Sequence, residues 1–189
     1  MGLTLTSAPA VEPVTLKQLK EHLRIYDTED HDVELTALIK EARQFIENQT
    51  GRALITQTWT YKLDGFDTNM NIPRPPLQSI TSIQYQDASD ATQTLASSNY
   101  SVDTDSEPGR VVQAPDGTYP STYDDINVVT VTFVAGYGST ASDVPETLKR
   151  AIKLRAEELW DMPTAAYATA LENAYMSAIL PYKIDWIAL

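Results

Sequence analysis

The chain has 189 residues, no cysteine and a formal net charge of −12. Its length suits one domain, or one domain with an insertion, and the absence of cysteine excludes disulfides, thiolate nucleophiles and cysteine-based metal sites. The charge argues against a protein that grips nucleic acid, because phosphate binding depends on Lys and Arg, but it suits a protein that DNA slides past.

The first predicted element is a short helix that follows a loose N-terminus. Residues 1–13 are mostly small and polar, and we expect them to be flexible. Thr15 and Gln18 have the spacing of a capping box, and leucines recur at helical intervals after them. This pattern predicts a helix from about Leu16 to Ile25.

A longer helix is predicted between Thr28, a favourable N-cap residue, and Gly51, a favourable residue for a left-handed helix end. The apolar residues between them recur at helical spacing and share one face. They are Leu35, Leu38, Ile39, Ala42, Phe45 and Ile46.

From Thr56 the apolar period changes from that of a helix to that of a strand. Polar and apolar residues alternate from Thr56 to Leu63, and another strand is predicted at about Ser79–Gln86. The stretch "DINVVTVTFVAGYG" is rich in β-branched residues and gives the strongest strand signal. Turn residues separate these runs, so we expect an antiparallel meander or a small barrel.

The helical period returns in "VPETLKRAIKLRAEELW", and a last helix is predicted over Ala165–Ile179. The fold class is therefore α+β. We expect a small four-helix bundle with an antiparallel β meander or barrel inserted between the second and third helices. The predicted parts are a helical bundle (14–53 and 143–180), a β domain (54–142) and an apolar C-terminal tail (181–189).

The sequence offers no motif for catalysis. His22 and His31 have no metal-binding spacing, and no nucleophile elbow, P-loop or dinucleotide fingerprint is present. The 26 acidic residues allow many carboxylate pairs, but none stands out as a glycosidase-type pair. We predict no catalytic residue, metal or cofactor, and a small hydrolase remains an alternative. We also expect no membrane association, because no signal-peptide pattern or long apolar run occurs.

The last eleven residues are unusually apolar for a chain end, where polar residues are the rule. This tail either packs on the chain's own helices or anchors the subunit to a partner or a neighbouring subunit. Its aromatic residues are of the kind that contributes most to interfaces. The apolar residues are Ile179, Leu180, Tyr182, Ile184, Trp186, Ile187 and Leu189.

Several stretches in this order resemble the head–tail connector (adaptor) proteins of tailed bacteriophages. They are "VTLKQLKEHLRI", "FIENQTGRALITQTW", "VTFVAGYG" and "VPETLKRAI". The resemblance extends from about Val14 to Tyr182 and is greatest to longer members that carry a β insertion.

The resemblance implies a structural virion protein and no enzyme. Connector subunits form a homo-oligomeric ring, commonly of twelve copies, under the portal protein of the filled capsid. The ring extends the DNA channel without specific DNA binding and receives the stopper or tail-completion proteins. Localisation would be the virion neck, after assembly in the host bacterial cytoplasm.

In this family the C-terminal segment typically reaches into the portal ring. By that resemblance Tyr182, Ile184, Trp186 and Ile187 are the expected portal-docking residues. The alternative is another neck or tail component, either a stopper or a tail terminator. Those proteins are usually β-rich throughout, whereas helices flank the predicted strands on both sides here.

Overall fold

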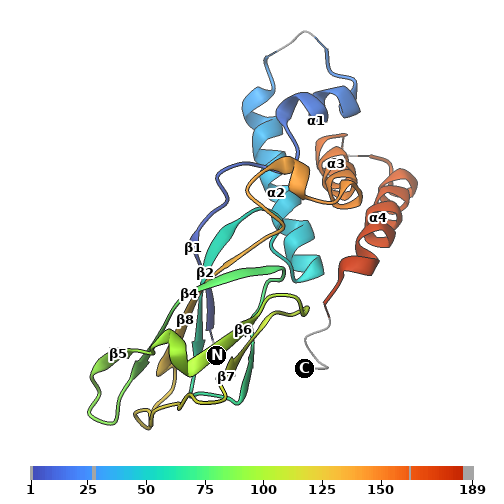
Figure 1. Ribbon diagram of the computed structural model, residues 1–189. Coiled ribbons are helices and arrows are strands. Elements are labelled where there is room, and N and C mark those ends of the chain that lie inside the picture. Colours follow the sequence, from blue (N-terminus) through green and yellow to red (C-terminus); the bar gives the residue numbers. More distant parts are fainter. Residues whose placement is uncertain (1, 27–28, 162, 185–189) are drawn as a thin grey trace. The chain divides into compact units, whose positions relative to one another are not determined.

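The computed structural model describes residues 2–26, 29–161 and 163–184 (Figure 1). In these residues the chain forms four α-helices and eight strands in two antiparallel sheets. It divides into two compact units. The described residues of the first, the β unit, are 2–9 and 56–137. Those of the second, the helical unit, are 10–26, 29–55, 138–161 and 163–184.

Helix α1 (Leu16–Leu23) starts at the capping box that the sequence predicts. Thr15 Oγ1 accepts a hydrogen bond from the Gln18 N–H at 3.2 Å, and Gln18 Oε1 accepts one from the Thr15 N–H at 2.9 Å. The helix ends slightly earlier than predicted, because Arg24 adopts the left-handed conformation with a φ of 57°.

Helix α2 (Asp32–Thr50) carries the predicted apolar face into the core. It ends where the sequence predicts, at Gly51, whose φ of 72° favours glycine. The predicted start is wrong, because His31 occupies the N-cap position without a side-chain hydrogen bond and the helix begins at Asp32; Thr28 itself lies outside the described residues. The apolar residues of α2 that are buried are Leu35, Ile39, Ala42 and Ile46.

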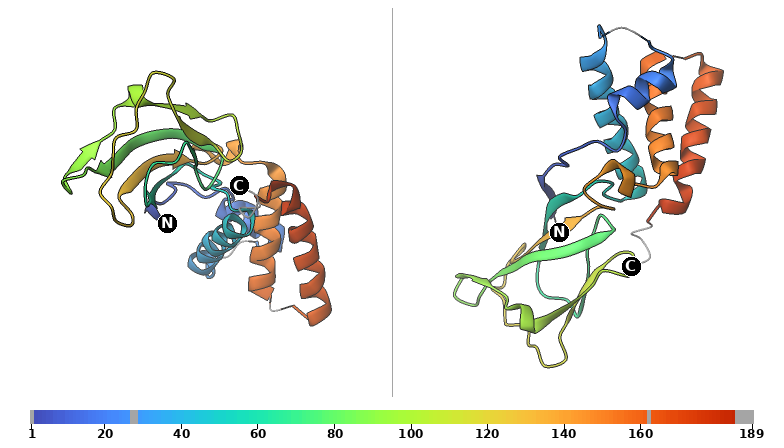
Figure 2. Two further views of the ribbon diagram at one scale, coloured as in Figure 1. Left: turned by 90° about the horizontal axis from the view of Figure 1, so that it is seen from below. Right: turned by 45° about the horizontal axis from the view of Figure 1, so that its top comes forward.

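Helix α3 (Glu146–Asp161) is the centre of the helical unit and contacts α1, α2 and α4 (Figure 2). Helix α4 (Ala165–Ile179) has the predicted bounds, and the short 3₁₀ turns η2 (Ala141–Asp143) and η3 (Leu180–Tyr182) precede α3 and follow α4. Residues 151–160 of α3 are all buried or half-buried.

Aromatic and charged side chains join α2, α3 and α4. The rings of Phe45 on α2 and Tyr175 on α4 meet edge to face, with their centroids 5.8 Å apart. The Arg155 guanidinium of α3 lies 4.5 Å from the centroid of the Phe45 ring. Burial, reinforced by the Glu158 carboxylate, raises the pKa of Tyr175, so this hydroxyl remains neutral at physiological pH. The three helices are therefore joined by interactions of defined geometry as well as by apolar packing.

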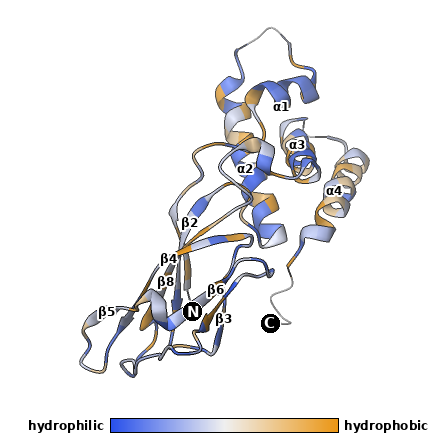
Figure 3. Ribbon diagram, viewed as in Figure 1, coloured by the Kyte–Doolittle hydropathy of each residue, from blue (hydrophilic) through white to orange (hydrophobic). Residues whose placement is uncertain are grey.

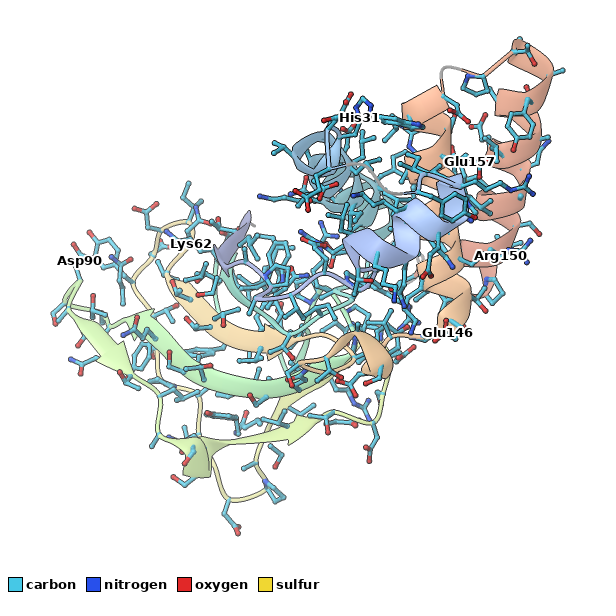
Figure 4. All side chains as sticks on the ribbon, turned by 90° about the horizontal axis from the view of Figure 1, so that it is seen from above. His31, Lys62, Asp90, Glu146, Arg150 and Glu157 are labelled. Atoms are coloured by element: carbon cyan, nitrogen blue, oxygen red, sulfur yellow. The ribbon has the colours of Figure 1, made fainter. Side chains whose placement is uncertain are left out.

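A second contact joins α1, α3 and α4 through one carboxylate. Glu157 of α3, labelled in Figure 4, contacts His22 Nε2 on α1 at 2.8 Å and accepts the Tyr167 hydroxyl of α4 at 2.5 Å. Figure 3 shows apolar and polar residues together on each helix, as expected for helices that bury one face.

The larger sheet has the strand order β1-β2-β8-β4-β5. Strand β8 (Val129–Ala135) lies at its centre between β2 (Gln57–Leu63) and β4 (Leu77–Gln86), and β5 (Thr92–Thr94) forms one edge. The central position suits the most apolar strand, because both of its edges are hydrogen-bonded there. Four alternate residues of β8 are fully buried, and they are Val129, Val131, Phe133 and Ala135.

The smaller sheet has the order β3-β7-β6, formed by β3 (Asn69–Asn71), β7 (Arg110–Gln113) and β6 (Tyr100–Asp103) after the turn η1 (Ser97–Asn99). Each sheet has two free edges in the described residues, so the predicted barrel is wrong. The larger sheet is also no simple meander, since its central strand is the last in the chain. Spacing along the sequence cannot fix such an order, because strand pairing is a long-range interaction.

The expected flexible N-terminus is wrong for Gly2–Ser7, which form strand β1. This strand pairs antiparallel with β2, and Leu3 and Leu5 lie opposite Tyr61 and Trp59. The physical reason is that β2 offers an unpaired edge, and the alternating residues "LTLT" suit it.

A buried ion pair ties the segment before α1 to the end of α2. Arg43 and Glu47 are only 3% and 5% exposed, and Arg43 Nη1 donates to Glu47 Oε2 at 2.5 Å. Arg43 Nε also donates to Glu12 Oε2 at 2.7 Å, while Glu47 Oε1 accepts the Leu54 N–H at 2.9 Å. Each buried charge therefore has partners in a second segment of the chain.

The Glu47→Ala substitution should lower the free energy of unfolding of the helical unit by about 3–5 kcal/mol, because it leaves the Arg43 charge buried and unpaired. Chemical unfolding followed by circular dichroism measures this change. Glu21→Ala is the matched control: Glu21 pairs with Lys17 at 3.9 Å on the exposed face of α1. Its loss should cost about 1 kcal/mol or less. If both substitutions lowered the free energy of unfolding equally, the Arg43–Glu47 pair would not be the stabilising buried ion pair described here.

In the β unit, a carboxylate organises the turn that joins β6 to β7. Asp103 Oδ2 accepts from the Ser106 hydroxyl at 2.7 Å and from Arg110 Nε at 2.9 Å, and its Oδ1 accepts the N–H groups of Asp105 and Ser106. These interactions, with the Ser106 hydroxyl first, lower the pKa of Asp103 to about 2.

Because this pKa lies below the ordinary value of 3.8, ionised Asp103 stabilises the folded state above about pH 4. That contribution is lost as the pH falls towards 2. Ser106→Ala should raise the pKa of Asp103, as measured by NMR titration of its carboxyl carbon. Ser101→Ala, at an exposed position of β6, should leave it unchanged. If the pKa of Asp103 were unchanged in the Ser106→Ala variant, the Ser106 hydroxyl would not be the main cause of its low value.

Candidate functional site

The C-terminal segment meets the helical unit at the end of α2. A helix leaves its last four carbonyl groups without partners inside the helix. The carbonyl of Thr50, the last residue of α2, accepts the Ile184 N–H at 3.0 Å. The C-terminal segment therefore satisfies a helix-end carbonyl that would otherwise need another partner.

A second hydrogen bond holds the same segment two residues earlier. Arg52 follows the helix-ending glycine, is 5% exposed, and donates from Nε to the Tyr182 carbonyl at 2.5 Å. A charged donor makes such a bond shorter and stronger than one between neutral groups. The main chain around Tyr182 and Ile184 is thus fixed to α2 at two points, and we call these four residues the tail anchor.

The geometry of the tail anchor depends on how α2 ends. Gly51 turns the chain sharply, and the Arg52 N–H donates to the Glu47 carbonyl at 3.2 Å. The Thr50 hydroxyl donates to the Ile46 carbonyl at 2.7 Å. These bonds position Arg52 and the Thr50 carbonyl, so the buried Arg43–Glu47 pair and the tail anchor lie in the same segment of the chain.

Of the four residues predicted to dock on a portal, Tyr182 and Ile184 are brought together at the tail anchor. Both are half-buried. Trp186 and Ile187 lie outside the described residues. The hydrogen bonds of the anchor involve the main chain of Tyr182 and Ile184 and leave their side chains free of that task.

Sequence reasoning missed the residues that hold the segment. Arg52 directly follows the helix-ending glycine, and Thr50 precedes it, but neither position has a motif. For the neighbouring Arg43–Glu47 pair the sequence did offer a signal, because a spacing of four residues permits an ion pair on a helix. That spacing does not reveal that the pair is buried.

The groups of the tail anchor can position a segment, but they offer no arrangement for a reaction. Across the described ranges, no group of three or more His, Asp or Glu side chains could hold a metal ion. The helices in those same ranges include none that is long and apolar enough to cross a membrane.

Comparison with known families gives a match over most of the chain. Residues 13–129 match the sequence profile of the phage gp6-like head-tail connector protein family. The match begins just before α1 and ends at the start of β8, so it includes α1, α2 and most strands. Comparison with curated proteins gives no match.

The fold is also similar to chains in solved particles of a gene transfer agent (GTA). A chain in the neck of the empty GTA particle, computed with C6 symmetry, has a TM-score of 0.82 at 21% identity, covering 98% of this chain and 96% of that chain. A chain in the native GTA virion has a TM-score of 0.78 at 21% identity, with the same coverage. A chain in the native neck, computed with C12 symmetry, has a TM-score of 0.72 at 20% identity, covering 93% and 94%.

At these identities the structural similarity establishes the fold alone, and the family match carries the assignment. The matched family consists of structural connector proteins of the virion and is not known as a family of enzymes. This agrees with the resemblance noted from the sequence. The chain belongs to the phage gp6-like head-tail connector protein family.

Proposed function

We propose that this chain is a subunit of a homo-oligomeric ring in the neck of a tailed phage or phage-like particle. The ring lies under the portal protein, extends the DNA channel and receives the stopper or tail-completion proteins. The single observation that carries the proposal is the family match over residues 13–129. The fold similarity to chains from GTA necks, computed with C6 and C12 symmetry, supports a ring, commonly of twelve copies.

In this proposal the helical unit forms the ring body, and strands β2 to β8 are an insertion between α2 and α3 that β1, from before α1, completes. The order of elements supports this division, because the chain leaves α2, forms β2 to β8 and then begins α3. The net charge of −12 supports a channel subunit that does not retain DNA. A negative surface repels phosphates and so lets DNA pass.

The C-terminal segment is the proposed portal contact, through Tyr182, Ile184, Trp186 and Ile187. The support is that Arg52 and Thr50 fix the main chain of this segment at the end of α2. A segment fixed at its base loses less conformational entropy on binding than one that is free along its whole length. Its sequence, with Trp186 and Ile187 beyond the anchor, is apolar enough to fill a pocket on a partner.

Two variants test this contact by sedimentation velocity with the portal ring of the same particle. Removal of residues 185–189 keeps the tail anchor and should abolish co-sedimentation. Trp186→Ala should weaken it by about 30-fold, since truncating an interface hot spot costs about 2 kcal/mol or more. Circular dichroism should show unchanged helix content in both.

Tyr26→Ala is the matched control, because Tyr26 is an aromatic residue of the helical unit that is 68% exposed. It should bind the portal as the wild type does. Normal binding by the shortened chain would overturn the docking role of the tail. Failure of the wild-type chain to bind would overturn the connector proposal and favour a stopper or tail terminator.

A further inference from the structure

Strand β1 has one edge that no strand of the described residues covers. It ends the five-stranded sheet and pairs only with β2, from Gly2 opposite Lys62 to Ser7 opposite Thr58 (Lys62 is labelled in Figure 4). All six of its residues are exposed. The outer edge of such a strand presents N–H and C=O groups that can pair with another chain.

The apolar face of the sheet continues to this edge. Leu5 lies opposite Trp59, which in turn lies opposite the fully buried Phe133. Residues directly opposite in adjacent strands point to the same face, so Leu5 extends the apolar row that begins at the sheet centre. Leu3 does the same in the neighbouring row. Leu3 and Leu5 are 37% and 39% exposed, although they lie on the core-facing side.

This edge has little of the usual protection against pairing. Monomeric proteins guard edge strands with charges, prolines or bulges. Gly2–Ser7 contain no charged residue and no proline, and the first charged residue of the chain is Glu12. The one protective feature is an irregularity in register between Leu5 and Ser7. The opposite edge of the sheet differs, because β5 has three polar residues and follows a turn containing Asp87 and Asp90.

A second copy of this chain is the occupant that the uncharged edge of β1 suits. Copies that each carry a net charge of −12 repel one another, so a contact between them is opposed least where the touching surfaces carry no charge. The edge of β1 is such a surface. This step rests on the proposed function, in which many copies surround one channel.

The free edge of β6 carries an exposed apolar residue, whereas the other edge strands β3 and β5 carry none. Its alternate residues Tyr100 and Val102 are apolar, and Val102 is 39% exposed. They can continue the row of Leu3 and Leu5, as alternate residues on paired strands do. A contact between two different edges is head to tail, so it repeats from copy to copy and can close into a ring.

We propose that β1 of one copy pairs along its free edge with β6 of a second copy. This contact adds main-chain hydrogen bonds between the copies and covers Leu3, Leu5 and Val102. It assigns the N-terminal strand a role in subunit assembly, separate from the role of the C-terminal tail in docking.

The test introduces charges at each edge. The double variant Leu3→Lys/Leu5→Lys and the single variant Val102→Lys should each weaken copy-to-copy association by at least about tenfold, because the contact would bury unpaired ammonium groups. Ile126→Lys is the matched control: Ile126 is apolar, 70% exposed and lies in the loop before β8. Sedimentation velocity measures association of the chain alone and with the portal ring, and circular dichroism checks the fold.

Mixing the two edge variants makes the test independent of any single loss of stability. The Leu3→Lys/Leu5→Lys copy retains a wild-type β6, and the Val102→Lys copy retains a wild-type β1. Their mixture should form heterodimers and no larger oligomers, since only one intact contact is available. Absence of heterodimers from two folded variants overturns the proposal.

The remaining outcomes separate this inference from the proposed function. Rings on the portal that form normally with the Leu3→Lys/Leu5→Lys copy overturn the edge contact and leave the connector function standing. Wild-type copies that associate through β1 but ignore the portal support the contact and overturn the docking function. Wild-type copies that never associate with one another overturn the edge contact.

Discussion

The buried carboxylate of Glu47 joins parts of the chain that are distant in sequence. Through Arg43 it is linked to Glu12 before α1, and through its other oxygen it holds the Leu54 N–H just before the chain enters β2. A charge at this depth persists only when its partners are in place, because its desolvation cost is several kcal/mol. The same helix end supplies the Thr50 carbonyl that receives the C-terminal segment. The segment before α1, the segment that leads into β2 and the C-terminal segment are therefore all held at the end of α2.

A connector, as proposed, must present fixed surfaces to its partners and needs no reactive groups. In the helical unit, charged side chains join different segments of the chain and so define its surface. These side chains are Arg43, Glu47, Arg52 and Glu157. The β unit differs, because each of its two sheets has two edges that no strand of the described residues covers. Such edges can take part in further strand pairing.

Local signals predicted much of the helical part from the sequence. The capping box at Thr15 and the stop at Gly51 depend only on neighbouring residues, and both are confirmed. Strand β1 was missed because "LTLT" is too short to indicate a strand until the edge of β2 is present to pair with it. The order of strands and the tail anchor were not predictable for the same reason. Both depend on contacts between residues far apart in sequence, such as Gln57 with Ala135 in the larger sheet and Arg52 with Tyr182 in the tail anchor.

The measurement that tests the central claim most directly is cryo-electron microscopy of the neck of the particle that contains this chain. The account predicts a closed ring of identical copies under the portal, with the channel on its axis and the C-terminal residues in contact with the portal. A neck in which this chain is absent, or in which it occurs as isolated copies outside any ring, would contradict it.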